Sequence, residues 1–560
     1  MYKYDDYDRT IVKQRVAEFR GQVERNLAGE LSDEELMPLR LRNGLYFQTH
    51  APMLRVAIPY GLLNSDQVRT LSMLATKYDK GYAHFTTRQN IQYNWPELKD
   101  VPDMLDHLAD VEMHAIQTSG NCIRNITADQ YAGVALDEIE DPRAYCEILR
   151  QWSTLHPEFY WLPRKFKIAI TGAQEDRAAV QFHDIGIRIL KNAAGEIGLQ
   201  MLVGGGLGRT PVIGKVIHEF LPKEDVISYC EAILRVYNLH GRRDNKYKAR
   251  IKILVNALGI EEFKRQVEAE WDQIKDSNLK LQAEDFERMQ EFFPDPAYEQ
   301  FSAEELTEST QRVEKWRSLD TRFQQWYENN TREHKQAGYR IVDISLKEPG
   351  IAPGDATDEQ MNAVADIADQ YSMGEVRVTH EQNLVLADVQ LDQLLELWKD
   401  LDAQRLATPN IGSINDMICC PGLDFCSLAN ASSISIAKQI NDRFDDLNEL
   451  YDLGEVKLKM SGCMNACGHH HVGHVGILGV DKKGVEWYQL TLGGSASDDS
   501  ALGDRLGPAI AKENVATAIS DIMHVYVNER QDDERLLDTY RRVGVEPFKA
   551  HVYREETGNV

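Results

Sequence analysis

A long-range internal repeat constrains the fold of this chain more than any other feature. Four anchors recur in the same order at nearly one offset: Gln89-Asn90 and Gln382-Asn383 lie 293 residues apart, Gly172 and Gly462 lie 290 apart, Gly186 and Gly476 lie 290 apart, and Gly204-Gly205 and Gly493-Gly494 lie 289 apart. Such a pattern predicts a duplicated unit of roughly 200 residues. We expect the two copies to pack about a pseudo-twofold axis, so that a site between them takes residues from both.

Two stretches have no counterpart in the repeat. The first 45 residues indicate an N-terminal extension, and residues 276–335, which are charged and poor in glycine, indicate a helical linker that wraps the surface. A chain of 560 residues is also too long for one hydrophobic core. The expected segments are 1–45, 46–116 and 117–275 for the extension and first copy, 276–335 for the linker, and 336–406 and 407–560 for the second copy.

The charge balance limits the possible partners. Lys and Arg number 63 against 89 Asp and Glu, which gives a net charge of −26 and a pI near 5.1. A surface this acidic repels nucleic acid and anionic membranes, so neither is an expected partner. An anionic substrate would be repelled as well unless a local pocket gathers the scarce cations.

The ends and the cysteine content indicate a cytoplasmic protein. The N-terminal MYKYDDYDRT has no apolar core of the kind that a secretory signal needs, and no run of about 18 apolar residues occurs. Eight cysteines are too few for a disulfide scaffold in a chain of 560 residues. We therefore expect thiols or metal ligands.

Five of the eight cysteines lie within 49 residues. Cys420 and Cys426 have the spacing C-x5-C, and Cys463 and Cys467 have the spacing C-x3-C. Four thiolates from two loops suit an iron-sulfur cube, although the spacing alone also allows a structural zinc ion or unligated buried thiols. Cys419 is the spare, because adjacent residues of an extended stretch rarely face one metal.

Two polar stretches could line an anion pocket. In WLPRKFKIAI, strand alternation places Lys165 and Lys167 on one face and Phe166 on the other, with Arg164 beside them. A continuous strand around Arg88 would likewise place Thr86, Arg88, Asn90 and Gln92 on one face. A solvated basic strand edge explains the lysine stretch equally well.

Five motifs in order resemble a known family. They are Thr86-Thr87-Arg88-Gln89-Asn90-x-Gln92, Arg124-Asn125, Arg164-Lys165-Phe166-Lys167, Cys420-x5-Cys426 and Gly462-Cys463-x-Asn465-x-Cys467. Together they are similar to the haemoprotein (beta) subunits of assimilatory sulfite reductase, within the sirohaem-dependent sulfite and nitrite reductases. The resemblance covers about residues 45 to 545. Met464 departs from it, since the family usually has proline there, which leaves the local loop shape open.

The resemblance implies an α+β fold with two pseudo-twofold-related halves. Each half would comprise a ferredoxin-like half-domain (46–116 and 336–406) and a larger cofactor-binding domain (117–275 and 407–560). It also implies a [4Fe-4S] cluster on Cys420, Cys426, Cys463 and Cys467, with Cys467 bridging to the iron of sirohaem.

The resemblance implies the site residues and the reaction as well. Arg88, Arg124, Lys165 and Lys167 would bind the substrate oxyanion, and Arg164 and Asn465 would contact the carboxylate-rich rim of sirohaem. The activity would be the six-electron reduction of sulfite to sulfide in assimilatory sulfur metabolism. The alternatives are a sirohaem nitrite reductase and, from another class, a non-catalytic iron-sulfur or zinc protein.

Other signals concern the electron donor and the remaining polar clusters. Gly204 to Gly208 lacks the G-x-G-x-x-G pattern of a dinucleotide site, so electrons must come from a separate protein, either a diflavin NADPH reductase subunit or a ferredoxin. We expect the histidines that follow Cys467 to pack around the cysteine loop rather than to bind metal.

The basic run from Arg242 to Lys252 allows three interpretations. It is a solvated helix face, a contact to sirohaem carboxylates or a donor-docking patch.

Overall fold

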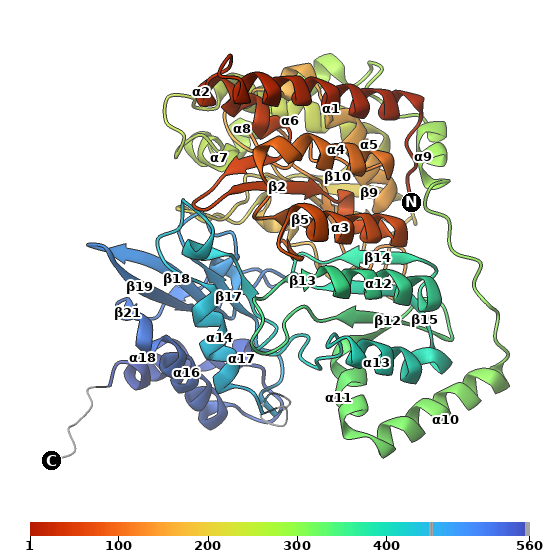
Figure 1. Cartoon of the computed structure of the whole chain (residues 1–560), viewed down its shortest axis with the longest axis vertical. Coiled ribbons are helices and arrows are strands. Elements are labelled where there is room, and N and C mark those ends of the chain that lie inside the picture. The colour runs from red at the N-terminus through yellow and green to blue at the C-terminus, as the bar shows by residue number, and fades with distance from the viewer. Residues whose placement is uncertain (447–449, 451, 555–560) are drawn as a thin grey trace.

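The computed structural model describes residues 1–446, 450 and 452–554 of the chain. It is an α+β fold, as the resemblance implies, with two small antiparallel sheets and two larger mixed sheets, and the first copy lies above the second in Figure 1. Among the described residues, no helix is both long and apolar enough to span a membrane.

The helices and strands alternate irregularly along the first half. Its helices are α1 (Asp6–Leu27), α2 (Asp33–Arg42), α3 (Ser65–Tyr78), α4 (Val101–Asp110), α5 (Arg143–Ser153), α6 (Val226–His240), α7 (Ile251–Leu258) and α8 (Ile260–Ile274). Its strands are β1 (Leu45–Phe47), β2 (Pro52–Ala57), β3 (Leu62–Asn64), β4 (Tyr82–Phe85), β5 (Asn90–Tyr93), β6 (Thr127–Ala128), β7 (Ile168–Thr171), β8 (Ile185–Lys191), β9 (Ile197–Val203) and β10 (Lys215–Pro222).

The linker is helical, and the second half follows the order of the first. The linker helices are α9 (Ala283–Gln290), α10 (Ala303–Leu319) and α11 (Thr321–Asn330). The later strands are β11 (Thr331–Glu333), β12 (Tyr339–Ile344), β13 (Asp355–Thr357), β14 (Glu375–Val378), β15 (Leu384–Gln390), β16 (Ile418–Cys419), β17 (Leu458–Ser461), β18 (Val475–Lys482), β19 (Val485–Leu492), β20 (Asp504–Arg505) and β21 (Ile510–Ala511). The later helices are α12 (Asp358–Tyr371), α13 (Leu394–Ala403), α14 (Ile434–Arg443), α16 (Val515–Glu529), α17 (Leu536–Val543) and α18 (Glu546–Val552).

The two copies exchange strands. One small sheet has the order β1-β2-β5-β4-β13, and the other has the order β11-β12-β15-β14-β3. Each sheet thus receives its last strand from the other copy, and β3 and β13 lie 293 residues apart. The duplication predicted from the sequence is therefore confirmed, and the copies are interlocked rather than merely in contact.

The helices after the exchanged strands begin in the same way. Asn64 caps α3 in a capping box with Gln67, and Thr357 caps α12 in a capping box with Gln360, 293 residues later. These side chains satisfy backbone N–H groups of the first helical turn. Helices α3 and α12 pack together across the pseudo-twofold axis, where Arg69 pairs with Asp366 at 2.8 Å.

The two larger sheets carry the site. Their orders are β10-β9-β8-β7-β6 and β16-β17-β18-β19-β20, and β21 pairs with β19. Strands β6, β7 and β8 run parallel to one another in the first of these sheets, and β16, β17 and β18 do so in the second. The repeated glycines of these sheets have a steric cause, since a Cβ on Gly186 would lie 2.2 Å from the carbonyl oxygen of Val180 and one on Gly476 would lie 2.0 Å from that of His470.

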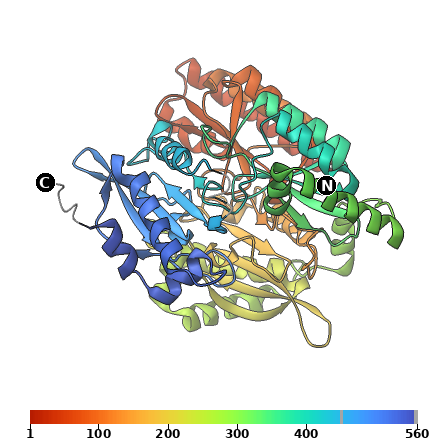
Figure 2. The same ribbon diagram turned by 90° about the horizontal axis from the view of Figure 1, so that it is seen from below.

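Helices cover much of the outside of the molecule, strand hairpins also reach its edge, and loops of both copies meet near its centre (Figure 2). Helix α9 packs on α5 of the first copy, whereas α10 packs on α13 of the second. The six-segment division of the chain stays a prediction.

Candidate functional site

Arg88 lies at the tip of a hairpin. The sequence predicts one continuous strand here, and that prediction is wrong: β4 ends at Phe85 and β5 begins at Asn90. Gln89 adopts a left-handed conformation with φ of 51°, and the Thr86 N–H donates to the Asn90 carbonyl at 2.8 Å. The turn projects Arg88 between the copies.

Among the described residues, only neutral acceptors hold the guanidinium of Arg88. It donates to the hydroxyl of Thr127 at 3.0 Å, to the carbonyl of Asn125 at 2.5 Å and to Nε2 of His183. His183 can accept because its Nδ1 lies 2.8 Å from the carbonyl of Ala179, to which it donates. The charge of Arg88 is therefore oriented without being neutralised.

Arg124 is arranged in the same way. Its guanidinium donates to the Thr118 carbonyl at 2.7 Å and to the Gly120 carbonyl at 2.8 Å. Its backbone N–H bonds to the Phe166 carbonyl at 2.8 Å, which places the Arg124 segment beside Lys165 and Lys167. No described carboxylate forms an ion pair with Arg124.

The predicted alternation of the lysine stretch is confirmed. Phe166 is buried in the core, whereas Lys165 and Lys167 line one cavity. Neither ammonium group has a hydrogen bond or ion pair with the described residues. Burial lowers the pKa of Lys165 to about 7 and that of Lys167 well below its usual range. A bound anion would raise both pKa values again.

Burial also lowers the pKa of Arg88, to about 9, and the neighbouring Arg124 lowers it further. The guanidinium keeps its charge at neutral pH. Three or more cations that lack counterions and face one space make an anion site.

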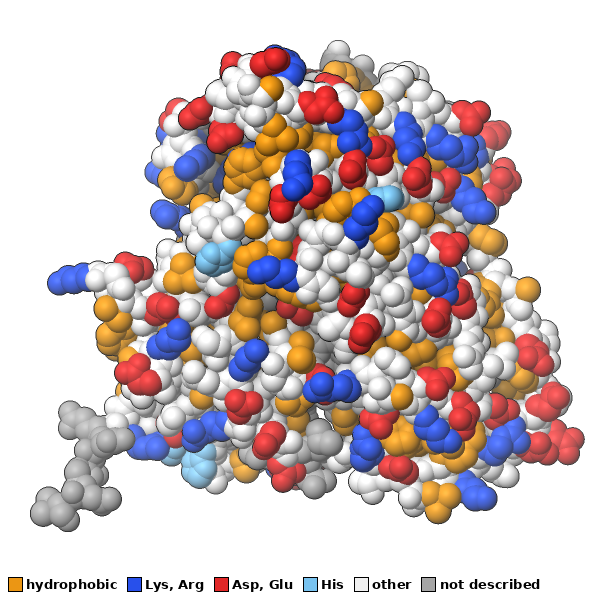
Figure 3. All heavy atoms as spheres, viewed as in Figure 1, with side chains coloured by type: hydrophobic (Ala, Val, Ile, Leu, Met, Phe, Trp, Pro, Cys, Tyr) orange, Lys and Arg blue, Asp and Glu red, His pale blue; other side chains and the backbone are white. Residues whose placement is uncertain are grey.

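Two adjoining cavities, here together called the cationic cavity, share Lys165, Lys167, Asn465 and Ala466 in their walls. No described Asp or Glu lines either of them. The outer surface differs, because Figure 3 shows acidic and basic side chains intermingled over one face. The cations of the cavity are Arg55, Arg88, Arg124, Arg164, Lys165, Lys167, Arg209, Lys246, Arg250 and Lys252.

Four cysteine thiols converge beside this cavity. Cys420 and Cys467 line it, and the Thr87 hydroxyl of the Arg88 hairpin donates to the Cys467 carbonyl at 2.8 Å. Burial raises the pKa of the Cys420, Cys426 and Cys463 thiols, and the nearby Cys467 raises each of them further. Cys467 is thus within electrostatic reach of the other three.

The cysteine loops fit a cluster of several irons better than a single metal ion. Among the described residues, no three His, Cys, Asp or Glu side chains are placed to hold one ion. The loops also approach closely, since a Cβ on Gly462 would lie 2.6 Å from the Ala431 carbonyl oxygen, and the Gly462 N–H points to Cys420 Sγ at 3.1 Å. Amide donors to thiolate sulfur are typical of iron-sulfur sites.

The cationic cavity fits the carboxylates of sirohaem. Arg164 and Asn465, predicted as rim contacts, both line it. The basic run contributes Lys246, Arg250 and Lys252. Its prediction as a helix face is wrong for most of its length, because α7 begins only at Ile251.

Several functional candidates were missed in the sequence. Asp184 is fully buried, accepts from Arg250 at 2.8 Å and from the Lys167 N–H at 2.8 Å, and thereby fixes two cationic segments. His183 orients Arg88, as described above. Both residues belong to the stretch His183-Asp184-Ile185-Gly186, from which only Gly186 contributes to the internal repeat. Arg55 carries no local signal, since its place follows from strand pairing with Gln92.

The histidines after Cys467 pack around the loop, as predicted. His471 Nε2 lies 2.9 Å from the Gly208 carbonyl, and His474 Nδ1 accepts from the Lys457 N–H at 3.2 Å. His469 and His470 are buried. Burial lowers the pKa of all four imidazoles.

Comparisons with known proteins agree with this geometry. The family described as "Nitrite and sulphite reductase 4Fe-4S domain" matches residues 119–275 and 412–560, and the "Nitrite/Sulfite reductase ferredoxin-like half domain" matches 48–111 and 333–404. Both families thus match once in each copy, so the duplicated arrangement implied by the resemblance is confirmed.

Relatives include enzymes for two substrates. A sulfite reductase [ferredoxin] 2 of Mycolicibacterium paratuberculosis is 28% identical over 516 residues, which cover 90% of this chain and 83% of that protein. A chloroplastic ferredoxin–nitrite reductase of Arabidopsis thaliana is 26% identical over 483 residues, or 84% and 75% of the two chains. The structure of Mycobacterium tuberculosis NirA matches with a TM-score of 0.77 at 24% identity over 97% of both chains, which shows a shared fold.

The predicted cofactors, a [4Fe-4S] cluster and sirohaem, are accordingly the cofactors of this oxidoreductase, and the described residues fit both. Family models match well over half of the chain. The chain belongs to the nitrite and sulphite reductase family.

Proposed function

We propose that this enzyme reduces sulfite to sulfide in assimilatory sulfur metabolism. The observation that carries the proposal is the cationic cavity, where ten Arg and Lys side chains and no described acid face one space in a chain of net charge −26. Sulfite is a small dianion, and the four converging cysteines lie beside the same space. Six electrons and seven protons convert sulfite to hydrosulfide and three waters.

In this proposal Cys420, Cys426, Cys463 and Cys467 would hold the [4Fe-4S] cluster, and Cys467 would also be the residue that the cluster shares with sirohaem. When bound, the two cofactors would supply the electrons for the reduction and an iron centre for the substrate. Cys467 is suited to the bridge because it is exposed and lines the cavity, unlike the buried Cys463. Arg164 and Asn465 contact the sirohaem rim, together with Lys246, Arg250 and Lys252.

Arg88, Arg124, Lys165 and Lys167 bind the oxygens of sulfite. The guanidinium groups are already oriented by neutral acceptors, so little reorganisation is needed when charge develops on the departing oxygens. Lys165, with a pKa lowered by burial to about 7, can hold or give up a proton near neutral pH. The pocket thus polarises each S–O bond and delivers protons to the oxygen that leaves as water.

Nitrite is the second candidate substrate, because ferredoxin–nitrite reductases are among the relatives. Two lysines without counterions favour the more highly charged sulfite. The two substrates are separated by comparing kcat/KM for each under the same reductant, and a preference for nitrite of tenfold or more would reverse the assignment.

We propose a ferredoxin as electron donor, because the sulfite and nitrite reductase relatives named above carry ferredoxin in their names. The other predicted donor is a diflavin NADPH reductase subunit, and the two donors can be compared in the same assay. Reduced ferredoxin is expected to support sulfide production, and NADPH with a diflavin reductase is not.

The first experiment uses protein expressed with sirohaem synthesis intact. Its optical spectrum should contain sirohaem bands, and reduced methyl viologen with sulfite should give sulfide. A variant that replaces Lys167 with Met should retain the bands and lose most of the activity. The control variant replaces Lys399 of α13, whose side chain is 52% exposed and pairs with an exposed Glu396.

Two results would reject the proposal. Protein with bound zinc and no iron would indicate the non-catalytic alternative. If the protein carries both cofactors but reduces neither sulfite nor nitrite, the proposed activity is wrong. The cofactor assignment would still hold.

A further inference from the structure

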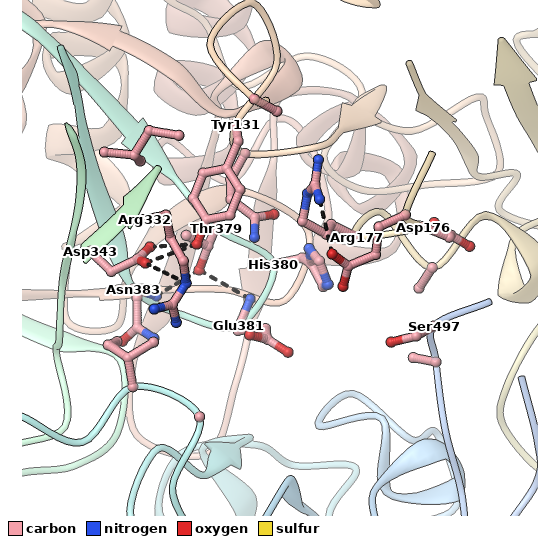
Figure 4. A pocket seen from close by; sticks show the side chains of 18 of the residues that line it. Tyr131, Asp176, Arg177, Arg332, Asp343, Thr379, His380, Glu381, Asn383 and Ser497 are labelled. Carbon is pink, nitrogen blue, oxygen red and sulfur yellow. Dashed lines mark hydrogen bonds and ion pairs between the residues drawn. The ribbon is translucent and has the colours of Figure 1, made fainter. Parts of the chain in front are cut away.

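The second copy contains a cavity of its own, here called the second cavity, of 460 Å³. It occupies the pseudo-twofold counterpart of the cationic cavity. The hairpin tip with His380 and Glu381 lines it, as the tip with Thr87 and Arg88 lines the cationic cavity. Lys457, just before β17, takes the place of Lys167, just before β7. Figure 4 shows His380 and Glu381 between a wall with Arg332 and Asp343 and a wall with Asp176 and Arg177.

Several charges of the cationic cavity are reversed here at matched positions, although Lys457 keeps the charge of Lys167. Arg88 precedes the repeat glutamine Gln89, whereas Glu381 precedes Gln382. Lys165 lies seven residues before Gly172, whereas Glu455 lies seven before Gly462.

Two further matched positions also differ in chemical character between the copies. Arg55 pairs with Gln92, whereas Asp343 pairs with Val385, 293 residues after Gln92. The counterpart of Cys467 is Arg177, five residues after the repeat glycine. The second cavity therefore lacks the bridging thiolate and presents carboxylates where a carboxylate-rich macrocycle would need cations.

Most charges of the second cavity are already paired at its walls. Glu381 and Glu455 lie 3.9 and 3.3 Å from the ammonium group of Lys457. Asp343 lies 3.9 Å from Arg332 and accepts from the Tyr131 hydroxyl at 2.8 Å. These carboxylates keep an acidic lining around the space.

One cation is not paired. Lys459 is 2% exposed, and its ammonium group has no hydrogen bond or ion pair with the described residues. Its direction is set by strand alternation, because Leu458 and Met460 belong to the hydrophobic core while Lys457 and Lys459 line the second cavity. The matched residue of the first copy is the apolar Ala169.

Two more polar atoms of the lining have no partner. His380 Nδ1 and Gln130 Oε1 are buried without a hydrogen bond to any described residue. Burial of polar or charged groups without partners is costly, so a ligand or ordered water must face them. A single metal ion is a poor occupant, since no three suitable side chains among the described residues converge.

An anionic group would pair with Lys459, and a cationic group is favoured beside it because the lining holds more carboxylates than cations. We propose that the second cavity binds a small zwitterion of the α-amino-acid class, with its carboxylate on Lys459 and its ammonium group facing Glu381 and Asp343. The volume leaves room for a side chain beyond that of glycine. This binding does not depend on the reaction proposed above.

The test is calorimetric titration of the holoenzyme at pH 7 with glycine, L-serine, L-cysteine and L-methionine, each separately. We expect saturable binding of at least one of them. Ethanolamine, which lacks the carboxylate, and N-acetyl-L-serine, which lacks the ammonium group, should bind at least tenfold more weakly than L-serine.

Variants locate the binding. Lys459→Met should weaken it by about 30-fold or more, as expected when one partner of a buried charge pair is removed. Glu381→Gln, which preserves shape, tests the ammonium contact if the lysine variant fails to fold, and it should weaken binding as well. Lys399→Met is the matched surface control and should leave binding unchanged.

Three outcomes would overturn the proposal. They are the absence of saturable binding for all four amino acids, equal binding of ethanolamine or N-acetyl-L-serine, and binding that both site variants leave intact. Since sirohaem loading and sulfide production are measured separately, failure of this proposal is distinguishable from failure of the proposed function.

Discussion

The cationic cavity and the second cavity are built on the same frame and have opposite linings. In both copies a hairpin tip in left-handed conformation, at Gln89 and at Gln382, lies between the sheets. The side chain just before that glutamine is an arginine in one copy and a glutamate in the other. A duplicated fold can therefore preserve its geometry while its two pockets acquire different chemistry.

The frame is preserved because the same amide serves the same purpose in each copy. Gln89 Nε2 donates to the carbonyls of Ala128 and Val378, each at 3.0 Å, and Gln382 Nε2 donates to those of Phe85 and Cys419 at 3.1 and 3.0 Å. Each glutamine thus ties its own copy to the other. Residues that point into the cavities carry no such constraint and have diverged.

The cysteines give the largest expected contrast between the copies. Cys467→Ser should remove the coupling between cluster and sirohaem and lower sulfite reduction by at least about 10³-fold, because the matched Arg177 position shows that the frame folds without a thiolate there. The measurements are the sulfide production rate and the electron paramagnetic resonance spectrum. Cys230→Ser in α6 is the control, since this cysteine is buried in the core and lines neither part of the cationic cavity, and full activity of the Cys467 variant would contradict the bridge.

The hairpin tip gives the next contrast. Arg88→Met should lower kcat/KM for sulfite by about 10²- to 10³-fold, since it removes one oriented donor from the anion site. Arg88→Lys restores the charge without the fork and should recover only part of the loss. Exposed Arg322→Met serves as control, and a methionine variant as active as wild type would remove Arg88 from the site.

The spacing of the repeat anchors predicted the duplication, and the family resemblance named Arg88, Arg124, Lys165 and Lys167, all of which line the cationic cavity, but not Arg55. Strand alternation placed Lys165 and Lys167 together because Phe166 needs the core. It failed around Arg88, where a turn interrupts the strand and the alternation rule no longer applies. The anchors Gly186 and Gly476 are visible in the sequence, but the reason that only glycine fits, a backbone carbonyl that would clash with any Cβ, needs the folded chain.

The second cavity could not be predicted from the sequence. Its walls combine Arg177 of the first copy with Glu381, Asp343 and Lys459 of the second, and only the packing of the copies brings them together. Asp184 was missed for a similar reason, because a buried carboxylate that braces Arg250 has no local pattern. The spacing of residues along the sequence does not show which charged side chains the packing of the two copies brings together.

Substitution of Gln89 or Gln382 should lower stability to the same extent, but only the Gln89 substitution should lower activity. Gln89→Ala and Gln382→Ala each remove two donated hydrogen bonds and leave a backbone N–H, of Ala128 or Cys419, without its acceptor. Each should lower the free energy of unfolding by about 3 kcal/mol. Denaturant unfolding measures this, with exposed Gln311→Ala in α10 as control. The Gln89 variant should also slow sulfite reduction, because Arg88 moves with it, and unequal stability losses would break the symmetry of the frame.

The smallest expected effect concerns Lys459, whose counterpart Ala169 carries no charge. Burial lowers the pKa of Lys459 to about 8, below its value in the unfolded chain, so below pH 8 the folded protein carries the full cost of an unpaired buried ammonium. In buffer free of amino acids, Lys459→Met should therefore raise the free energy of unfolding at pH 7 by about 1 to 2 kcal/mol. The gain should shrink as pH rises from about 8 towards 10.4, where the lysine also loses its proton in the unfolded chain. Urea unfolding at pH 7 and pH 9.5 measures both values, and a gain that grows with pH would show that Lys459 is paired in the folded protein.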